Sequence, residues 1–174
     1  MTQAPLYRIE VLSGDHNRAA FSCGVEPLDR YFQTQVTQDI RRYITNCFVA
    51  VSTETGDVAA YYTMASASIP TPDLPAEEIK RLPRYPTMPA VRIGRLAVDI
   101  KYRNLGLGRI LIMDATAKTL NAAPASYALL VDAKDDKAES FYQKHGFHNL
   151  TGMPCVLFLP LATAQKALLL GKNS

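Results

Sequence analysis

The chain has 174 residues with a formal net charge of +3, and 48% of its residues are hydrophobic while 20% are charged. These values are those of a globular protein with its own core, expected as a single domain over residues 1–174, and they exclude a disordered or fibrous chain. The apolar stretches are too short to cross a bilayer and the N-terminus lacks a basic, apolar leader, so we expect a cytoplasmic protein with no membrane segment.

In the first half of the chain, the hydrophobic pattern predicts a strand, a helix and a hairpin. Residues 6–12 read as a strand, and residues 26–44 read as a helix. The apolar residues on roughly one face of that helix are Leu28, Tyr31, Phe32, Val36 and Ile40. Strands are expected at 47–52 and 58–66, joined by a Thr-Gly-Asp turn. Tyr61 and Tyr62 are neighbours on the second strand, so one is expected in the core and the other toward a cleft.

The second half begins with a proline-rich segment, 69–89, which resists regular structure apart from a helical turn at 76–81. The elements expected after it are a strand at 91–100, a helix from Ile110, a strand at 128–133, a helix capped by Asp135 and Gly146, a strand at 155–161 and a helix at 163–170. This order is typical of an α/β protein with a mixed sheet.

The most informative motif is the loop Arg103-Asn104-Leu105-Gly106-Leu107-Gly108, between the strand that ends at 100 and the following helix. A glycine-bearing loop at a helix start directs backbone N–H groups to one point, at the positive end of the helix dipole. It fits neither a Walker loop, which needs Lys-Ser or Lys-Thr, nor the G-x-G-x-x-G fingerprint. The loop therefore predicts a pyrophosphate site, and a helix start with glycines for packing stays open as the alternative.

A second motif stands in the helix after the strand at 128–133, where the sequence reads A-x-x-F-Y-x-x-x-G-F from Ala138 to Phe147. The two motifs, in this order, resemble the GNAT N-acetyltransferases, whose fold is a mostly antiparallel twisted sheet flanked by helices. The resemblance implies acetyl-CoA as the acetyl donor and Tyr142 as general acid, although Tyr142 by itself also suits a packed aromatic. The residues that it implies for the cofactor are Leu96, Ala97, Val98, Arg103, Asn104, Leu105, Gly106, Leu107, Gly108 and Arg109.

Three N-terminal and central segments narrow the resemblance to one branch of this family. They are F-S-C-G-V-E-P-L-D at 21–29, A-Y-Y-T-M at 60–64 and V-R-I-G-R-L-A-V-D at 91–99. They resemble the acetyltransferase toxins of bacterial toxin–antitoxin pairs, which acetylate the α-amino group of aminoacyl-tRNA and halt translation. The resemblance implies a ribbon-helix-helix antitoxin, contact with operator DNA only through the antitoxin complex, and a homodimer. The alternative is a GNAT enzyme that acts on a small amine or a peptide N-terminus.

The segment from 80 to 109 holds eight Lys or Arg and one acidic residue, a net charge of +7. Such an excess attracts a polyanion, although a solvated face or the cofactor phosphates explain it equally well. The residues that we expect to contact tRNA are Lys80, Arg81, Arg84, Arg92 and Arg95.

A free α-amino group has a pKa of roughly 7.7–8.0, and esterification to tRNA lowers it further. Much of the amine is then already deprotonated near neutrality, so the reaction needs no strong general base. His145 and His148 flank a helix end, where a cation is favourable, and a catalytic role for either is the less favoured interpretation. The three cysteines form no C-x-x-C pair, so we expect free thiols, no disulfide framework and no metal site.

Overall fold

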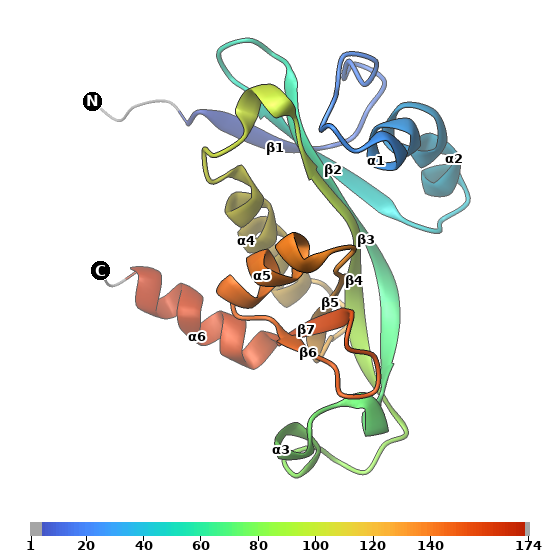
Figure 1. Cartoon of the computed structure of the whole chain (residues 1–174), viewed down its shortest axis with the longest axis vertical. Helices are drawn as coiled ribbons and strands as arrows, with labels where there is room; N and C mark the ends of the chain where they lie inside the picture. Colours follow the sequence, from blue (N-terminus) through green and yellow to red (C-terminus); the bar gives the residue numbers. More distant parts are fainter. Residues whose placement is uncertain (1–4, 173–174) are drawn as a thin grey trace. The chain divides into compact units, whose positions relative to one another are not determined.

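The computed structural model describes residues 5–172. The chain divides into two compact units, Met1–Ala65 with Gly94–Asp114 and Ser66–Ile93 with Ala115–Ser174. Seven strands follow one another in the sheet order β1-β2-β3-β4-β5-β7-β6 (Figure 1). The single domain expected over 1–174 stays a prediction.

The first unit is built on β1 (Tyr7–Val11), β2 (Asn46–Ser52) and the beginning of β3 (Val58–Pro70). These strands pair antiparallel, with Tyr7 opposite Ser52 and Cys47 opposite Thr63. A helical stretch precedes β2 and consists of α1 (Glu26–Arg30), a π-helical turn η1 (Tyr31–Gln35) and α2 (Val36–Arg41).

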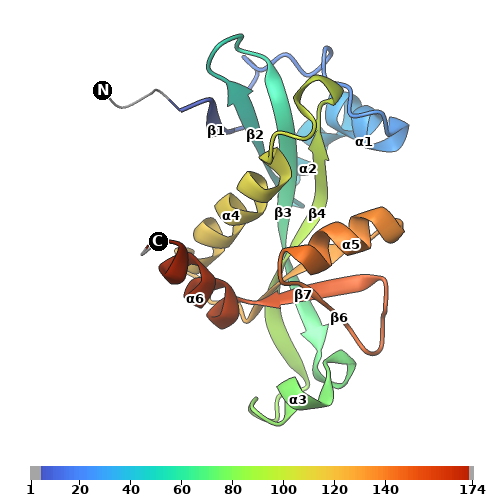
Figure 2. The ribbon, with the colours of Figure 1, turned by 60° about the vertical axis from the view of Figure 1, so that its left-hand side comes forward.

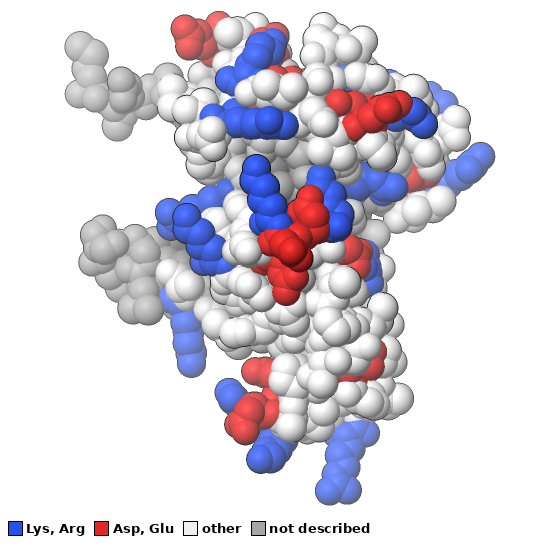
Figure 3. Space-filling model, in the orientation of Figure 1, with Lys and Arg blue, Asp and Glu red and all other residues white. Residues whose placement is uncertain are grey.

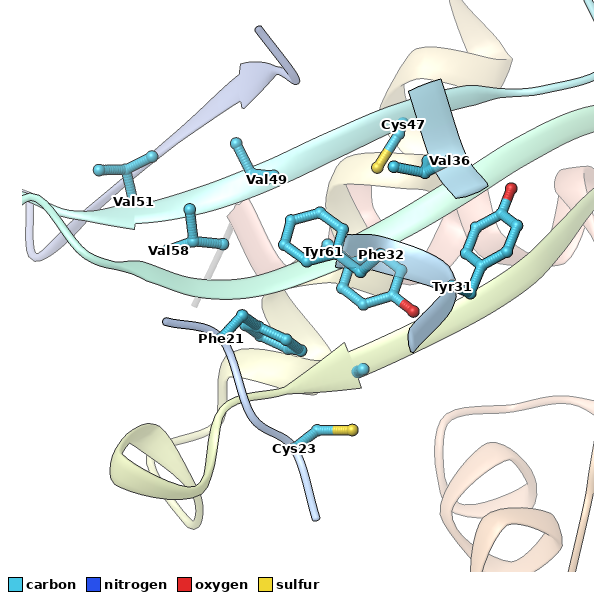
Figure 4. Close-up of a cluster of buried hydrophobic side chains, with 11 residues drawn as sticks. Phe21, Cys23, Tyr31, Phe32, Val36, Cys47, Val49, Val51, Val58 and Tyr61 are labelled. Carbon is cyan, nitrogen blue, oxygen red and sulfur yellow. The ribbon is translucent and has the colours of Figure 1, made fainter. Parts of the chain in front are cut away.

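The core of this unit lies where that helical stretch packs on β2 and β3 (Figure 4). The Phe32 and Tyr61 rings stack with centroids 4.2 Å apart, and the Phe21 ring meets Tyr61 edge-on at 5.4 Å. The predicted helix face is confirmed, because Tyr31, Phe32 and Val36 are buried while Leu28 and Ile40 pack against the cluster.

The loop from β4 to the next helix contains a 3-10 turn, η3 (Ile100–Tyr102), and leads into α4 (Leu107–Leu120). Tyr62 donates a hydrogen bond to the Asp114 carboxylate, so α4 is tied to β3 by a buried phenol.

The second unit contains most of β4 (Thr87–Val98), which pairs parallel with β5 (Ala128–Asp132), and β7 (Val156–Pro160), which pairs antiparallel with β5. Its remaining elements are the 3-10 turn η2 (Thr71–Asp73), α3 (Ala76–Ile79), α5 (Asp136–Lys144), β6 (His148–Asn149) and α6 (Leu161–Lys172). In Figures 1 and 2, α5 lies beside β7. The core includes Ile69, Leu130 and Phe158.

The element order expected from the sequence is confirmed, but several boundaries were wrong. The first helix ends at Arg41 rather than 44, because Tyr43 adopts φ 58°. β3 runs on to Pro70 and β4 begins at Thr87 rather than 91, so the proline-rich connection is shorter than predicted. β4 ends at Val98, because the Asp99 side chain accepts the Lys101 N–H and starts a turn.

Two further expectations were wrong at the residue level. The helix after the glycine loop begins at Leu107, so Leu107, Gly108 and Arg109 form its first turn rather than part of the loop. Both Tyr61 and Tyr62 are fully buried, because this part of β3 is covered on both faces. The short strand β6 was not predicted, and α6 is longer than the expected 163–170.

Candidate active site

The loop before α4 passes twice through left-handed backbone. Asn104 has φ 61° and Gly106 has φ 77°, and both are exposed together with Leu105. A Cβ on Gly106 would meet no atom within 4 Å, and the Ile110 N–H closes the first helical turn on the Gly106 carbonyl at 3.2 Å. Because the first N–H groups of a helix have no partner inside it, this loop offers open, positively polarised backbone that fits a pyrophosphate.

Arg103, the first residue of the loop motif, is tied to the segment before α1. Its guanidinium donates to the Cys23 carbonyl, and its Nη2 lies 2.7 Å from where a Cβ of Gly24 would stand. Gly24 has φ 84°, so the missing side chain both permits this backbone and makes room for the guanidinium. This contact uses one of five guanidinium donors, and binding of a pyrophosphate by Arg103 stays a prediction.

Two carboxylates hold the same segment. Asp99 is 3% exposed and accepts the Ser22 N–H at 3.0 Å, while Asp29 accepts the Cys23 N–H at 2.8 Å. The F-S-C-G, L-D and A-V-D motifs and Arg103 therefore meet on the main chain of residues 22–23. The role of these two carboxylates was not predicted from the sequence. The only indication there was that the motifs at 21–29 and 91–99 each end in an aspartate directly after an apolar residue.

Leu96, Ala97 and Val98 close β4, and the family resemblance implies all three for binding of the cofactor. The pairing of β4 with β5 covers Ala90–Ile93, so these three residues follow the last position that pairs with β5, while β4 also has β3 as a neighbour in the sheet. Backbone groups on the side without a partner strand are available to a ligand. Their role toward acetyl-CoA is compatible with this placement and stays a prediction.

Tyr142 lies near the end of α5, in the second unit. Its side chain is buried, and its ring packs edge-on against Phe141 and Phe147 at centroid distances of 5.3 and 5.4 Å. The Phe147 N–H donates to the Tyr142 carbonyl at 3.1 Å, and the Gly146 N–H donates to the Gln143 carbonyl at 3.1 Å. With φ 93° at Gly146, this is a Schellman motif. Gly146 ends the helix as predicted and fixes the backbone of Tyr142.

Burial raises the pKa of Tyr142 to about 12, and the charge of Asp132 adds to the effect. The phenol therefore stays protonated at neutral pH and is suited to donate a hydrogen bond rather than to act as a base. Asp132 ends β5 and forms an ion pair with Arg92 of β4. Sequence reasoning missed Asp132, although a charged residue closing the apolar run 128–131 was visible.

Three of the five residues expected to contact tRNA follow α3 in the chain. Lys80, Arg81 and Arg84 are all exposed, and Figure 3 shows basic side chains projecting where Figure 1 places α3, with acidic side chains among them. These three residues are open to a polyanion.

The other two basic residues already have partners inside the fold. Arg92 is half-buried and paired with Asp132. The guanidinium carbon of Arg95 lies 3.4 Å from the centroid of the Tyr31 ring, and the Tyr31 hydroxyl donates to Asp39 at 2.8 Å. Contact of either arginine with tRNA stays a prediction.

The remaining candidates have structural partners or lie apart. Asp135 caps α5 as expected, accepting the Ala138 N–H at 2.8 Å. His145 Nδ1 lies 2.8 Å from the Phe141 carbonyl, a contact in which the ring nitrogen donates. Cys23 and Cys47 are buried, whereas Cys155 is exposed. Between residues 5 and 172, no His, Cys, Asp or Glu side chains gather in threes as a metal site, and no helix is long and apolar enough to cross a membrane.

Comparison with known proteins assigns the family. Residues 81–156 match the acetyltransferase (GNAT) domain. A tRNA-acetylating toxin of Mycobacterium tuberculosis is 31% identical over 148 residues, covering 84% of this chain and 87% of that protein. The chain therefore belongs to the GNAT acetyltransferases, in the family of the tRNA-acetylating toxins.

Two solved structures share the fold over nearly the whole chain. AtaT complexed with acetyl-methionyl-tRNAfMet has a TM-score of 0.84 at 27% identity, covering 93% of this chain and 99% of that one. A tyrosine-to-phenylalanine mutant of AtaT, bound to the C-terminus of the antitoxin AtaR and to acetyl-CoA, has a TM-score of 0.74 at 26% identity, covering 95% and 99%.

Proposed function

We propose that this protein transfers an acetyl group from acetyl-CoA to the α-amino group of aminoacyl-tRNA and thereby blocks translation. The observation that carries the proposal is the 31% identity to a tRNA-acetylating toxin over 84% of the chain. The open glycine loop before α4 and the protonated, buried Tyr142 supply the groups that such a reaction needs.

The cofactor-binding residues are proposed to act through backbone and charge. The N–H groups from Asn104 to Arg109 bind phosphate oxygens at the start of α4, where the helix dipole favours negative charge. The exposed Arg109 adds a cation in the first turn. Leu96 to Val98 present N–H groups that orient and polarise a carbonyl, a contribution of about 3 kcal/mol for one donor. Acetyl-CoA supplies the acetyl group as a reactive thioester.

Tyr142 is proposed as the catalytic residue. Its Oη holds a proton at neutral pH, because burial raises the pKa of the phenol to about 12. A leaving thiolate, whose ordinary pKa is about 8.5, is a weaker base than this phenolate. Tyr142 therefore acts mainly as a hydrogen-bond donor that stabilises developing negative charge, and the incoming amine loses its proton to solvent.

The relatives support the proposed substrate and partners. AtaT is bound to a tRNA in one structure and to the C-terminus of its antitoxin in another. We propose an antitoxin partner of the ribbon-helix-helix class, contact with operator DNA only through that complex, and a homodimeric toxin. A reaction on charged tRNA takes place in the cytoplasm. Lys80, Arg81, Arg84, Arg92 and Arg95 are proposed to contact tRNA phosphates.

The test is transfer of labelled acetyl from acetyl-CoA to a pool of charged tRNAs. Label on the aminoacyl group supports the proposal, and a pool that stays unlabelled while the protein binds acetyl-CoA contradicts it. Neutralising Lys80, Arg81 and Arg84 separates the alternative, because an enzyme for small amines or peptide N-termini would keep its full activity.

A further inference from the structure

Tyr43 occupies a backbone position that normally belongs to glycine. The Ile44 N–H donates to the Asp39 carbonyl at 2.9 Å and the Tyr43 N–H donates to the Ile40 carbonyl at 3.1 Å. Together with φ 58° at Tyr43, these bonds form a Schellman motif that ends α2. The left-handed residue of this motif is usually Gly, because a Cβ there crowds the following carbonyl.

The Tyr43 ring contributes nothing to the packing of the fold. Tyr43 is 97% exposed and the following Ile44 is 56% exposed. A bulky residue held in left-handed backbone is a genuine outlier, and such strain is concentrated at functional positions. No packing of the ring offsets this strain inside the fold. Because the ring is exposed, it is available for contact with a ligand.

The charge next to this ring is uncompensated. Arg41 and Arg42 precede Tyr43 and are exposed, and neither forms an ion pair with any residue between 5 and 172. Arg30 of α1, by contrast, is paired with Glu26. Figure 3 shows basic side chains projecting at the surface around α2.

An exposed aromatic ring beside two free guanidinium groups matches the chemistry of single-stranded nucleic acid. Unpaired bases stack on aromatic faces whatever their sequence, and arginines bind the phosphates that connect them. A folded protein partner would instead need a broad, well-packed patch with few charges at its centre.

We infer that Tyr43, flanked by Arg41 and Arg42, is a stacking platform for an unpaired base of the RNA substrate. The inference rests on the proposed function, since it assigns part of the tRNA surface. Unpaired segments of a charged tRNA, such as its 3′ end, are what this chemistry would hold.

The test measures RNA affinity and stability in the same variants of the full chain. The probe is a fluorescent single-stranded RNA oligonucleotide ending in CCA, titrated at fixed salt. Tyr43→Gly is expected to weaken binding about tenfold, the effect of losing one base stack, while its thermal unfolding midpoint stays equal or rises because the strain is removed. Tyr43→Phe, which keeps the ring, is expected to bind within about twofold of the unchanged protein.

The salt dependence tests the two arginines. Replacing Arg41 and Arg42 by Gln should lower the slope of log affinity against log salt by about 0.7 for each phosphate contact that is lost. An unchanged slope would overturn their part in the platform.

Two results would overturn the inference. The first is equal RNA binding by Tyr43→Gly and the unchanged protein. If Tyr43→Gly also loses self-association, the surface around Tyr43 binds a second copy of the chain and not RNA. The second is a lowered unfolding midpoint in Tyr43→Gly, which would assign the ring to the fold. Failure of the unchanged protein to acetylate charged tRNA would contradict the proposed function alone, because the oligonucleotide titration needs no acetyl transfer.

Discussion

Tyr142 combines a buried ring with a phenol that keeps its proton. Removing only the hydroxyl, in Tyr142→Phe, leaves the packing on Phe141 and Phe147 intact. We expect kcat for acetyl transfer to fall by about a hundredfold or more, the usual cost of removing one positioned hydrogen-bond donor, with no change in the circular dichroism spectrum.

The matched control for this variant is Tyr127→Phe. Tyr127 is a half-buried tyrosine of the same unit, and its hydroxyl donates to Glu78. Its loss should leave kcat unchanged. A Tyr142→Phe protein that acetylates at the normal rate would remove Tyr142 from the mechanism while leaving the proposed substrate untouched.

A substitution at Gly24 tests the hydrogen bond from Arg103 to Cys23, which holds the segment before α1. Both Gly24 and Gly56 have positive φ, 84° and 78°, but a Cβ on Gly24 would meet Arg103 at 2.7 Å whereas one on Gly56 would meet nothing within 4 Å. Gly24→Ala should therefore cost about 1–2 kcal/mol more unfolding free energy than Gly56→Ala, because it also breaks the hydrogen bond from Arg103 to Cys23. Urea titrations of both variants measure the difference.

The Arg103→Ala background provides the control. There the extra cost of Gly24→Ala should disappear, because no guanidinium is left to displace. Equal losses for the two glycines in the unchanged background would show that Arg103 moves aside freely.

Residues whose partners are close in the chain could be predicted from the sequence, whereas contacts between distant residues could not. The pattern around Tyr142, Asp135 and Gly146 is local, so the cap, the helix end and the tyrosine between them could be placed from neighbouring residues. The bonds from the Ser22 N–H to Asp99 and from Arg103 to the Cys23 carbonyl join residues 77 and 80 positions apart. No local pattern reports such a bond, because it depends on how the elements pack.

Among the helices and strands, α4 allows a test in which one substitution changes stability and ligand binding in opposite directions. The substitution introduces an acidic residue in the first turn of the helix. Gly108 lies in that turn. A negative charge at the start of a helix interacts favourably with the helix dipole and stabilises the fold, but it repels a bound phosphate. Gly108→Glu should raise the thermal unfolding midpoint and weaken CoA affinity, measured by calorimetry, by about tenfold relative to Gly108→Gln.

The Gly108→Gln variant separates charge from bulk, since its side chain has nearly the same shape as glutamate. Identical CoA affinities for the Glu and Gln variants would mean that the start of α4 does not face the phosphates.

The predicted boundaries of helices and strands were wrong where pairing between distant residues overrides the local preference of the sequence. β4 includes Pro89, which local rules place in a loop, yet the Pro89 carbonyl accepts the Tyr127 N–H at 2.8 Å and the strand continues. The π-helical turn over Tyr31–Gln35 is likewise invisible in the apolar spacing, because one extra residue barely shifts the buried face.

At the scale of the whole molecule, buried phenols and a buried thiol predict sensitivity to alkali. Burial raises the pKa of Cys47 to about 12, and burial raises the pKa of Tyr31, Tyr61, Tyr62 and Tyr127 as well. The folded state therefore keeps protons that the unfolded chain releases. Its unfolding free energy should be steady below about pH 8.5 and should then fall by up to about 1.4 kcal/mol per pH unit for each such proton.

Urea titrations from pH 7 to 11 measure this dependence. Cys47→Ala should remove the part of the loss that begins near the ordinary thiol pKa of about 8.5 and leave the tyrosine part above pH 10. An unfolding free energy that stays level to pH 11 would contradict the burial of these groups.

We propose that the protein acetylates the amino group of an aminoacyl-tRNA and recognises the tRNA as well as the amine. The most direct test compares labelled acetyl transfer to a charged tRNA with transfer to the methyl ester of the same amino acid. We expect a kcat/KM at least about a hundredfold higher for the charged tRNA, because base stacking and phosphate contacts contribute only there. Equal values for the two substrates would contradict it and identify an acetyltransferase of small amines.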